Sequence, residues 1–231
     1  MIRYNSIFIL MRKRFLSLIM ICFITIDVWA QIHDGGNHGL MTVTLKKNEN
    51  MNAVQGSPYL NEEFQRGTAV VDEKEPLNVF LRYDVSREIF EIKTAISSNE
   101  ILMLPPNLKT EYHVAGDKFI YDNIRFEGKN INGYFKEHYS GKQFRLLEKP
   151  TVTITEPIEA KTGYEKDRPA RIVMGEEFFV ISNDGQVKNV SLKQRDVKKM
   201  FPSNIAKKYL KENKVRSIED LAAFVAYLDK N

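Results

Sequence analysis

The segment Glu176–Leu192, EEFFVISNDGQVKNVSL, gives the clearest local indication of the fold of this chain. Two runs rich in β-branched and aromatic residues lie on either side of Asn183-Asp184-Gly185. These three residue types tolerate the left-handed backbone conformation that a tight hairpin turn requires. The segment therefore predicts two antiparallel strands joined by a short turn.

Similar runs, separated by turn residues, recur in the part of the chain that precedes this hairpin. The gaps between them are too short for crossover helices, which disfavours a parallel α/β sheet. The longest gap, Pro157–Pro169, is polar and forms either a loop or a decorated hairpin. The pattern predicts a β-meander that forms a curved antiparallel sheet of about eight to ten strands. We expect strands over 68–72, 77–85, 88–95, 100–104, 110–114, 118–121, 132–139, 143–155, 170–182 and 186–192.

After residue 192 the spacing of apolar residues changes to that of a helix. Helices are expected around 197–201 and over 204–213, with a break at Pro202-Ser203 between them. A third helix is the clearest, because Ser217 and Asp220 have capping-box character and an apolar stripe follows them. The expected fold class is α+β, with two or three C-terminal helices packed on one face of the sheet. The stripe consists of Leu221, Phe224, Val225 and Leu228.

The first thirty residues have the features of a secretory signal peptide. Arg12-Lys13-Arg14 precedes the apolar run Phe15–Ile26, and Val28 and Ala30 occupy the positions before the expected cleavage. The run is well short of the roughly 20 residues that span a bilayer. We expect residues 1–30 to be removed and the protein to be exported to the periplasm or the extracellular space, and Met11 is an alternative start.

Three further segments follow the expected cleavage. Residues 31–55 are rich in Gly, Asn and Lys and are expected to form a flexible leader. An antiparallel β domain is expected over 56–192, and the helices of 193–231 pack on the same domain. The stretch Gly56–Gly67, GSPYLNEEFQRG, is interpreted as an N-terminal clamp in which Tyr59, Leu60 and Phe64 anchor the leader to the first hairpin.

Composition excludes several kinds of chemistry. The only cysteine, Cys22, lies inside the signal segment, so the mature chain has no disulfide, thiol nucleophile or cysteine–zinc site. The formal net charge of +4 falls to about +1 once residues 1–30 are removed, and nucleic acid is therefore not an expected partner. The sequence contains no Gly-rich phosphate loop, EF-hand loop or HExxH motif, and no cofactor is expected.

The charge is unevenly distributed along the mature chain. Residues 193–216 contain nine Lys or Arg against two acids, whereas residues 31–192 have a net charge of −4. This basic helical end suits weak contact with an anionic surface such as lipid headgroups or an acidic glycan. The simpler interpretation is that its lysines form the solvated backs of helices. They are Lys198, Lys199, Lys207, Lys208 and Lys211.

Few residues are candidates for a metal or catalytic site. Gln31-Ile32-His33 would place an amine, amides and an imidazole where Cu(II) or Ni(II) binds, so His33 is a weak metal candidate. His113 and His138 lie in strand-like segments without a nucleophile motif nearby. The acid pairs Glu62-Glu63 and Glu176-Glu177 point to opposite faces if they are extended, so neither is an acid and base pair by itself. No catalytic residue is assigned.

Two groups of residues favour scaffold roles. Arg82, Asp84, Glu88 and Glu91 flank an expected hairpin, where cross-strand ion pairs contribute roughly 0.2 to 1 kcal/mol each. Seven aromatic residues between 119 and 144 are typical of packed hairpins. A sheet with an incompletely covered aromatic face would instead hold an apolar or glycan ligand. The seven are Phe119, Tyr121, Phe126, Tyr134, Phe135, Tyr139 and Phe144.

Four segments of the mature chain carry a resemblance to known proteins. They are GSPYLNEEFQRG (56–67), LRYDVSREIFEIK (81–93), GYFKEHYSGKQFRLLEK (133–149) and YLKENKVRSIEDLAAFVAYLDKN (209–231). Together they resemble a family of uncharacterised exported proteins of Bacteroidetes-type Gram-negative bacteria. The likeness covers nearly the whole mature chain and implies a β-rich domain of the cell envelope, with no activity, cofactor or active residue to carry over. Similar proteins tend to have Asn or Asp at the turn where this chain has Ser86-Arg87.

These observations favour a non-enzymatic protein of the envelope that binds a partner protein, or an apolar or glycan ligand, through a sheet face or edge. The alternative is a hydrolase that acts on envelope carbohydrate or peptide and uses acids from separate strands. A third interpretation is an accessory protein at the membrane surface that uses the basic helices.

Overall fold

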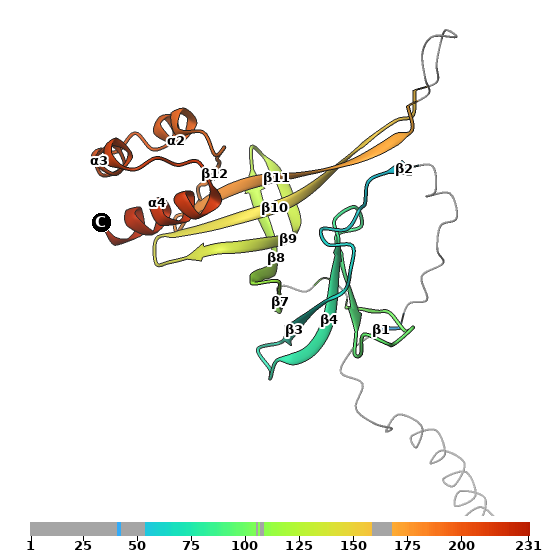
Figure 1. Ribbon diagram of the computed structural model, residues 1–231. Coiled ribbons are helices and arrows are strands. Elements are labelled where there is room, and N and C mark those ends of the chain that lie inside the picture. Colours follow the sequence, from blue (N-terminus) through green and yellow to red (C-terminus); the bar gives the residue numbers. More distant parts are fainter. Residues whose placement is uncertain (1–40, 43–53, 105, 107–108, 159–167) are drawn as a thin grey trace, which may run out of the picture. The chain divides into compact units, whose positions relative to one another are not determined.

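The computed structural model describes residues 41–42, 54–104, 106, 109–158 and 168–231, which belong to the unit Leu40–Asn231. Twelve strands form one sheet (Figure 1). They are β1 (Met41–Thr42), β2 (Val54–Gln55), β3 (Gln65–Val71), β4 (Leu77–Asp84), β5 (Ile89–Lys93), β6 (Leu102–Met103), β7 (Thr110–Val114), β8 (Asp117–Phe126), β9 (Lys129–Ser140), β10 (Phe144–Thr155), β11 (Ala170–Ser182) and β12 (Val187–Asn189).

The sheet is open, with the strand order β1-β6-β5-β4-β3-β7-β8-β9-β10-β11-β12 and with β2 beside β11. All neighbouring strands are antiparallel except β2 and β11, which are parallel. The predicted antiparallel α+β fold is therefore confirmed. Strands β1 and β2 fall inside the segment 31–55 that the sequence indicated as a leader. Strand β1 lies in the short alternation Leu40–Leu45, whereas β2 has no alternation by which the sequence could reveal it.

Positive backbone φ angles mark the hairpin turns. Ala115 and Gly116, with φ of 56° and 90°, form the two-residue turn between β7 and β8. Gly185 has a φ of 83°, and its N–H donates to the carbonyl oxygen of Ser182 at 2.9 Å in the turn that the sequence predicted. Glu127 and Gly128 form a further turn, between β8 and β9. Such φ values suit glycine and are tolerated by only a few other residues.

Strand β8 is longer than predicted. The predicted strand ended at Tyr121, and the next two residues, Asp122 and Asn123, are common turn residues. The strand continues to Phe126 because Ile124 and Phe126 point to the same face and pack in a hydrophobic cluster with residues of β9, β10 and β11. Burial of this face outweighs the local turn preference.

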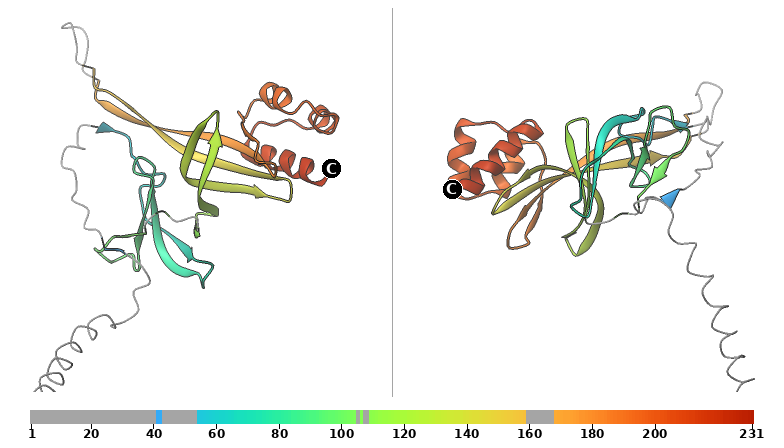
Figure 2. Two further views of the ribbon diagram at one scale, coloured as in Figure 1. Left: turned by 180° about the vertical axis from the view of Figure 1, so that it is seen from behind. Right: turned by 90° about the horizontal axis from the view of Figure 1, so that it is seen from below.

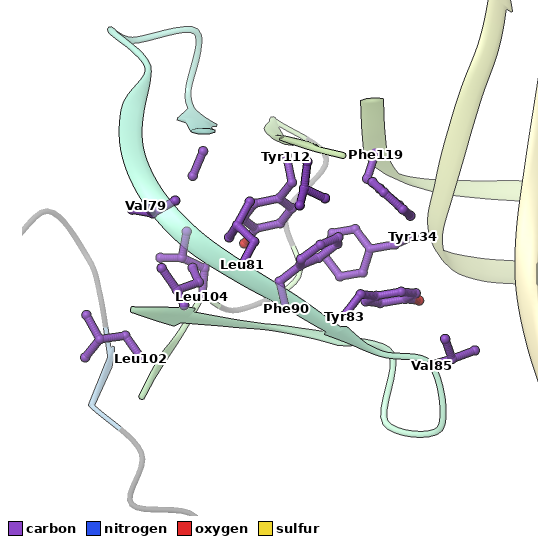
Figure 3. Close-up of a cluster of buried hydrophobic side chains, with 13 residues drawn as sticks. Val79, Leu81, Tyr83, Val85, Phe90, Leu102, Leu104, Tyr112, Phe119 and Tyr134 are labelled. Atoms are coloured by element: carbon purple, nitrogen blue, oxygen red, sulfur yellow. The ribbon is translucent and has the colours of Figure 1, made fainter. Parts of the chain in front are cut away.

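An aromatic cluster fills the face of the sheet formed by β4, β5, β7, β8 and β9 (Figure 3). Phe90 lies at its centre and stacks on Tyr112 and Tyr83, with ring centroids 4.1 and 4.7 Å away. Phe119 and Tyr134 present their edges to Phe90 at 5.2 and 5.1 Å. We call these five residues the aromatic cluster. Burial raises the pKa of Tyr134 to about 12, which reflects how little water reaches this core.

Three helices follow the sheet: α2 (Gln194–Met200), α3 (Asn204–Glu212) and α4 (Ile218–Lys230). Ser217 and Asp220 form the predicted capping box at the start of α4. The predicted stripe of α4 is buried against Leu146 of β10 and Phe178 of β11 in a second hydrophobic cluster, so the expected packing on one sheet face is confirmed. Within the described residues, no helix is both long and apolar enough to cross a membrane.

The C-terminal end of α4 is also fixed to the sheet by polar contacts. The carboxylate of Asp229 accepts N–H donations from Lys142, Gln143 and Phe144 at 3.0, 2.6 and 2.8 Å. Burial acts to raise the pKa of Asp229, but these backbone N–H groups outweigh it and lower the pKa. Helix α4 is thereby held to the turn between β9 and β10.

Candidate functional site

The N-terminal clamp surrounds Arg82 of β4. The guanidinium carbon of Arg82 lies 3.9 Å from the ring centroid of Tyr59 and 4.4 Å from that of Phe64. Its Nη1 donates to the carbonyl oxygen of Glu62 at 3.0 Å, and the N–H of Leu60 donates to the carbonyl oxygen of Tyr83 at 3.0 Å. Tyr59, Leu60 and Phe64 therefore anchor the chain to the first hairpin, as the sequence predicted.

Two buried acids lie beside this clamp. Glu91 has an exposed fraction of 0% and accepts hydrogen bonds from Arg82 Nη2 at 2.6 Å, from the Tyr59 hydroxyl at 3.2 Å and from Arg87 Nη2. Asp84 is 2% exposed and accepts from Arg87 Nε at 2.6 Å and from Ser86 Oγ at 2.7 Å. The oxygens of both acids are occupied by donors from the clamp and its hairpin, which assigns these acids to the scaffold.

The expected ion pairs of this hairpin are partly confirmed. Arg82 pairs with Glu91 across β4 and β5, but Glu88 pairs with Lys149 instead of Arg82. The expected contribution of roughly 0.2 to 1 kcal/mol applies to solvated cross-strand pairs. It is too small for Glu91, because removing one partner of a buried pair leaves the other charge uncompensated.

Lys149 of β10 forms a second ion pair, in which the Lys149 side chain is 9% exposed and that of its partner Glu88 is 43% exposed. Its Nζ donates to Glu88 Oε1 at 2.8 Å and to the carbonyl oxygen of Asn132 at 3.0 Å, and it lies 5.2 Å from the ring centroid of Phe135. Gly133 makes room for this pair, since a Cβ at that position would overlap both Lys149 Nζ and the Glu88 carboxylate. The pair connects the turn after β4 to β10.

A polar seam lies between the aromatic cluster and the hydrophobic cluster of the helices, and it consists of Lys136, His138 and Glu148. The Nε2 atom of His138 is 2.7 Å from Glu148 Oε2, and Lys136 Nζ is 3.2 Å from Glu148 Oε1. Lys136 also pairs with Asp117 at 3.2 Å. Burial acts to raise the pKa of Glu148, but the hydrogen bond to His138 and the charge of Lys136 lower it below its ordinary 4.5.

A histidine hydrogen-bonded to an acid is also found in hydrolytic triads, where the histidine activates a nucleophile. Within the described residues, the partner of His138 is Glu148, and no hydroxyl group is hydrogen-bonded to the imidazole. Lys136 also contacts Glu148, and its positive charge neutralises the acid. The seam therefore acts as a charge-neutralising contact between two hydrophobic clusters, and it should respond to pH.

We expect the polar seam to lose stability in acid. The folded protein lowers the pKa of Glu148, so its charged form stabilises folding above the unfolded pKa, and this contribution disappears as the pH falls through the folded pKa. Glu148→Gln should be less stable than the unmodified protein at pH 7, and the difference between the two should shrink below about pH 4.5. Urea unfolding at several pH values measures this difference, and a difference that does not change with pH would contradict the assignment.

The other predicted site residues do not gather into one centre. His33 lies outside the described residues. His113 is exposed on β7, 3.6 Å from Glu111, while its neighbour Tyr112 is fully buried, as strand alternation predicted. In the described part of the chain, no group of three or more His, Cys, Asp or Glu side chains is arranged to hold a metal ion.

The predicted aromatic region belongs mainly to the core. Phe119 and Tyr134 are in the aromatic cluster, whereas Phe135 is buried on the opposite face with Phe179, so the rings divide between the two faces of the sheet. Tyr139 and Phe144 pack against the cluster that contains the helices. The rings contact one another and their apolar neighbours, which accounts for this run by packing.

Strands β10 and β11 form a ribbon that extends beyond the part of β10 that pairs with β9. The two strands pair along the whole of β10, but β9 pairs with β10 only over Arg145–Glu148 (Figures 1 and 2). Beyond Glu148, none of the described strands pairs with this side of β10. We call the unpaired stretch Thr151–Thr155, TVTIT, the ribbon edge.

The ribbon edge is uncharged and β-branched throughout. Val152 still packs against the hydrophobic core that contains the aromatic cluster, whereas Ile154 is 57% exposed and its two neighbours are also exposed. Pro150, just before the edge, has no N–H to donate to a neighbouring strand. An open edge of this composition offers backbone donors and acceptors to another extended chain.

The outer side of β11 differs from the ribbon edge. Strand β2 pairs with Ala170–Arg171, and β12 pairs with Phe179–Ile181. Between them, Glu176 and Glu177 are exposed, and neither is in an ion pair with another described residue. Charges on an open edge discourage strand addition. Of the two sides of the ribbon, the β10 side is the better candidate for binding.

Sequence reasoning missed both the polar seam and the ribbon edge. Leu147-Glu148-Lys149 resembles an ordinary amphipathic strand, yet all three residues are buried. A signal for the open edge was present in the sequence, where the uncharged run TVTIT follows Pro150. No family model, curated protein or solved structure matches this chain.

Proposed function

We propose that this chain is an exported, non-enzymatic binding domain that captures an extended segment of a partner protein by strand addition at the ribbon edge. The observation that carries the proposal is the open, uncharged side of β10 from Thr151 to Thr155, with Ile154 exposed. Strand addition uses main-chain hydrogen bonds for affinity and alternate side chains for specificity. Export is supported by the signal-like segment 1–30.

The chemistry of the buried acids favours binding over hydrolysis. Asp84, Glu91 and Glu148 are the buried Asp and Glu residues of the described chain, and each is held by one or more cationic side chains. A hydrolase that uses two acids needs one carboxylic acid and one free carboxylate facing a shared substrate. Within the described residues, the geometry provides an open edge, and the three buried acids do not form such a pair.

The bound segment should itself be an extended strand. On one face of β10, Val152 and Ile154 would contact alternate apolar residues of the added strand, and on the other face Thr151, Thr153 and Thr155 would contact polar or β-branched residues. We therefore expect a partner segment of about five to seven residues with alternating apolar and hydroxyl side chains and without proline.

Selection from a library of peptides displayed on phage tests this proposal. The purified protein should enrich segments with that alternation, and Ile154→Lys should weaken their binding by about tenfold or more because it places a charge at the edge. Val173→Lys, at an exposed position of β11, is the matched control and should bind as the unmodified protein does. Enrichment without alternation, or equal loss in both variants, would contradict the proposal.

A further inference from the structure

The surface of α2, α3 and the segment before α4 is strongly basic. It has nine cationic side chains, and every one of them is exposed. Among the described residues, Arg195 forms an ion pair, with its neighbour Asp196 at 3.5 Å, and the other eight form none. We call the nine the basic helical surface: Lys193, Arg195, Lys198, Lys199, Lys207, Lys208, Lys211, Lys214 and Arg216.

Solubility alone does not require this arrangement of charge. Lys207 and Lys211 are four residues apart on α3, and Lys208 and Lys211 are three apart, so like charges adjoin along the helix. Such pairs weaken a helix, whereas mixed signs would keep the same surface solvated and strengthen it. The first turn of α3 has no acid, and Glu212 at its end forms no ion pair within the described chain. A surface that retains this repulsion fits an anionic partner.

The basic helical surface is held in a fixed shape. The side-chain amide of Gln194 in α2 donates to the carbonyl oxygen of Leu210 at 3.0 Å and accepts from the N–H of Val215 at 2.7 Å. Val197 of α2 and Ala206 of α3 are fully buried beneath the surface. Helices α2 and α3 lie side by side in each view (Figures 1 and 2). The lysines therefore project from a preformed support.

An exposed apolar side chain adjoins the cation Lys208 on α3. Ile205 is 39% exposed in the first turn of α3, directly before the buried Ala206 and three residues before Lys208. An exposed apolar residue beside cationic side chains is typical of surfaces that lie at the headgroup boundary of a bilayer. A soluble polyanion would use the charges and leave Ile205 without a contact.

We propose that the basic helical surface docks on the anionic surface of a phospholipid bilayer. Each lysine near such a surface strengthens binding by about fivefold, and the attraction extends over roughly one Debye length. The contact is peripheral, with the lysines at the headgroups and Ile205 at the boundary of the acyl chains. It leaves the ribbon edge free, because the helices pack on the part of the ribbon that contains Leu146 and Phe178. This proposal does not depend on strand addition.

Flotation with vesicles tests the proposal through two variants of equal charge. One replaces Lys198, Lys199, Lys207, Lys208 and Lys211 with Gln. The control replaces five exposed cations outside the basic helical surface, each without an ion pair among the described residues, with Gln. Both variants lower the net charge by five. The control positions are Lys74, Arg125, Lys129, Lys142 and Arg171.

The unmodified protein and the control should float with vesicles of phosphatidylcholine and phosphatidylglycerol, and none of the proteins should float with phosphatidylcholine alone. Binding of the helix variant should fall by more than about a hundredfold. Raising the salt concentration should release the unmodified protein, which tests the proposal without any substitution. Thermal unfolding should show that the helix variant is folded, since its substitutions remove like-charge repulsion.

Three outcomes would overturn the proposal. The unmodified protein does not float with anionic vesicles, its binding does not change with salt, or the control loses as much binding as the helix variant. Binding to a soluble acidic polysaccharide without vesicle binding belongs to the first outcome and would assign the surface to a different partner.

Discussion

Replacing Glu91 with alanine is expected to lower the free energy of unfolding by about 3–5 kcal/mol. Glu91 is fully buried and pairs with Arg82 and Arg87, and it also accepts a hydrogen bond from Tyr59. The substitution leaves two guanidinium groups without their shared acid and frees the hydroxyl that connects the N-terminal clamp to β5. Chemical unfolding in urea, monitored by circular dichroism, measures this loss.

Glu177→Ala is the matched control for that experiment. Glu177 is also a strand glutamate, but it is exposed and forms no ion pair among the described residues. Its replacement should change the free energy of unfolding by less than about 0.5 kcal/mol. If Glu91→Ala cost no more than this control, the buried network would not be the support that joins the clamp to the hairpin.

Replacing Phe90 with alanine is expected to cost about 3–5 kcal/mol as well, through a different mechanism. Phe90 is 1% exposed and contacts the four other rings of the aromatic cluster (Figure 3). Its removal leaves a cavity that four rings in strands cannot close without moving the backbone, and it also removes the favourable ring contacts. Urea unfolding measures the cost.

Phe90→Leu distinguishes the stability that comes from the filled volume from the stability that comes from the ring contacts. Leucine keeps part of the buried volume and loses the ring contacts, so its cost should lie between zero and that of alanine. Equal costs for Phe90→Leu and Phe90→Ala would mean that the stacked geometry, and not the filled volume, is the main source of stability. A cost below about 1 kcal/mol for Phe90→Ala would contradict the central place of this ring in the core.

The succession of most strands and helices along the chain could be predicted because local signals agree with the tertiary structure, whereas the pairing of β3 with β7 in the sheet was not predicted. Gly185 in the turn Asn183-Asp184-Gly185 and Gly116 in the turn after β7 accept the positive φ angles that these turns adopt. The stripe of α4 repeats at helical spacing and is buried as a unit. The predicted end of β8 was wrong because the burial of Ile124 outweighs the local turn preference of Asp122-Asn123. That burial depends on strands that are distant in sequence.

The polar contacts were harder to predict, because their partners lie far apart in sequence. Lys149 and Glu88 are separated by 61 residues, and the space for their contact comes from the absence of a side chain at Gly133. Arg87 forms ion pairs with both Asp84 and Glu91. The Asp84 carboxylate also accepts a hydrogen bond from the backbone N–H of Arg87, which closes the turn and brings the guanidinium near both acids. The alternation of residues along a strand predicts the face to which a charged side chain points. It does not identify the oppositely charged residue that forms the ion pair.

The candidate binding edge shows the same limit. The composition of TVTIT indicates a strand. One side of this strand is open because β9 pairs with β10 only as far as Glu148, and the sequence does not show where that pairing ends. The basic helical surface was visible in the sequence as a cluster of charge. The sequence does not reveal that eight of the nine cations of this surface form no ion pair with another described residue, because this depends on the folded arrangement of the acids.

Hydrogen exchange of the ribbon in the presence of a selected peptide tests the central claim most directly. Strand addition at the ribbon edge should slow the exchange of backbone amides within Thr151–Thr155 and leave Val173–Glu177 on the outer side of β11 unchanged. Slowed exchange confined to β11 or to the helices, or no change within Thr151–Thr155 at saturating peptide, would contradict the assignment of this edge as the binding site.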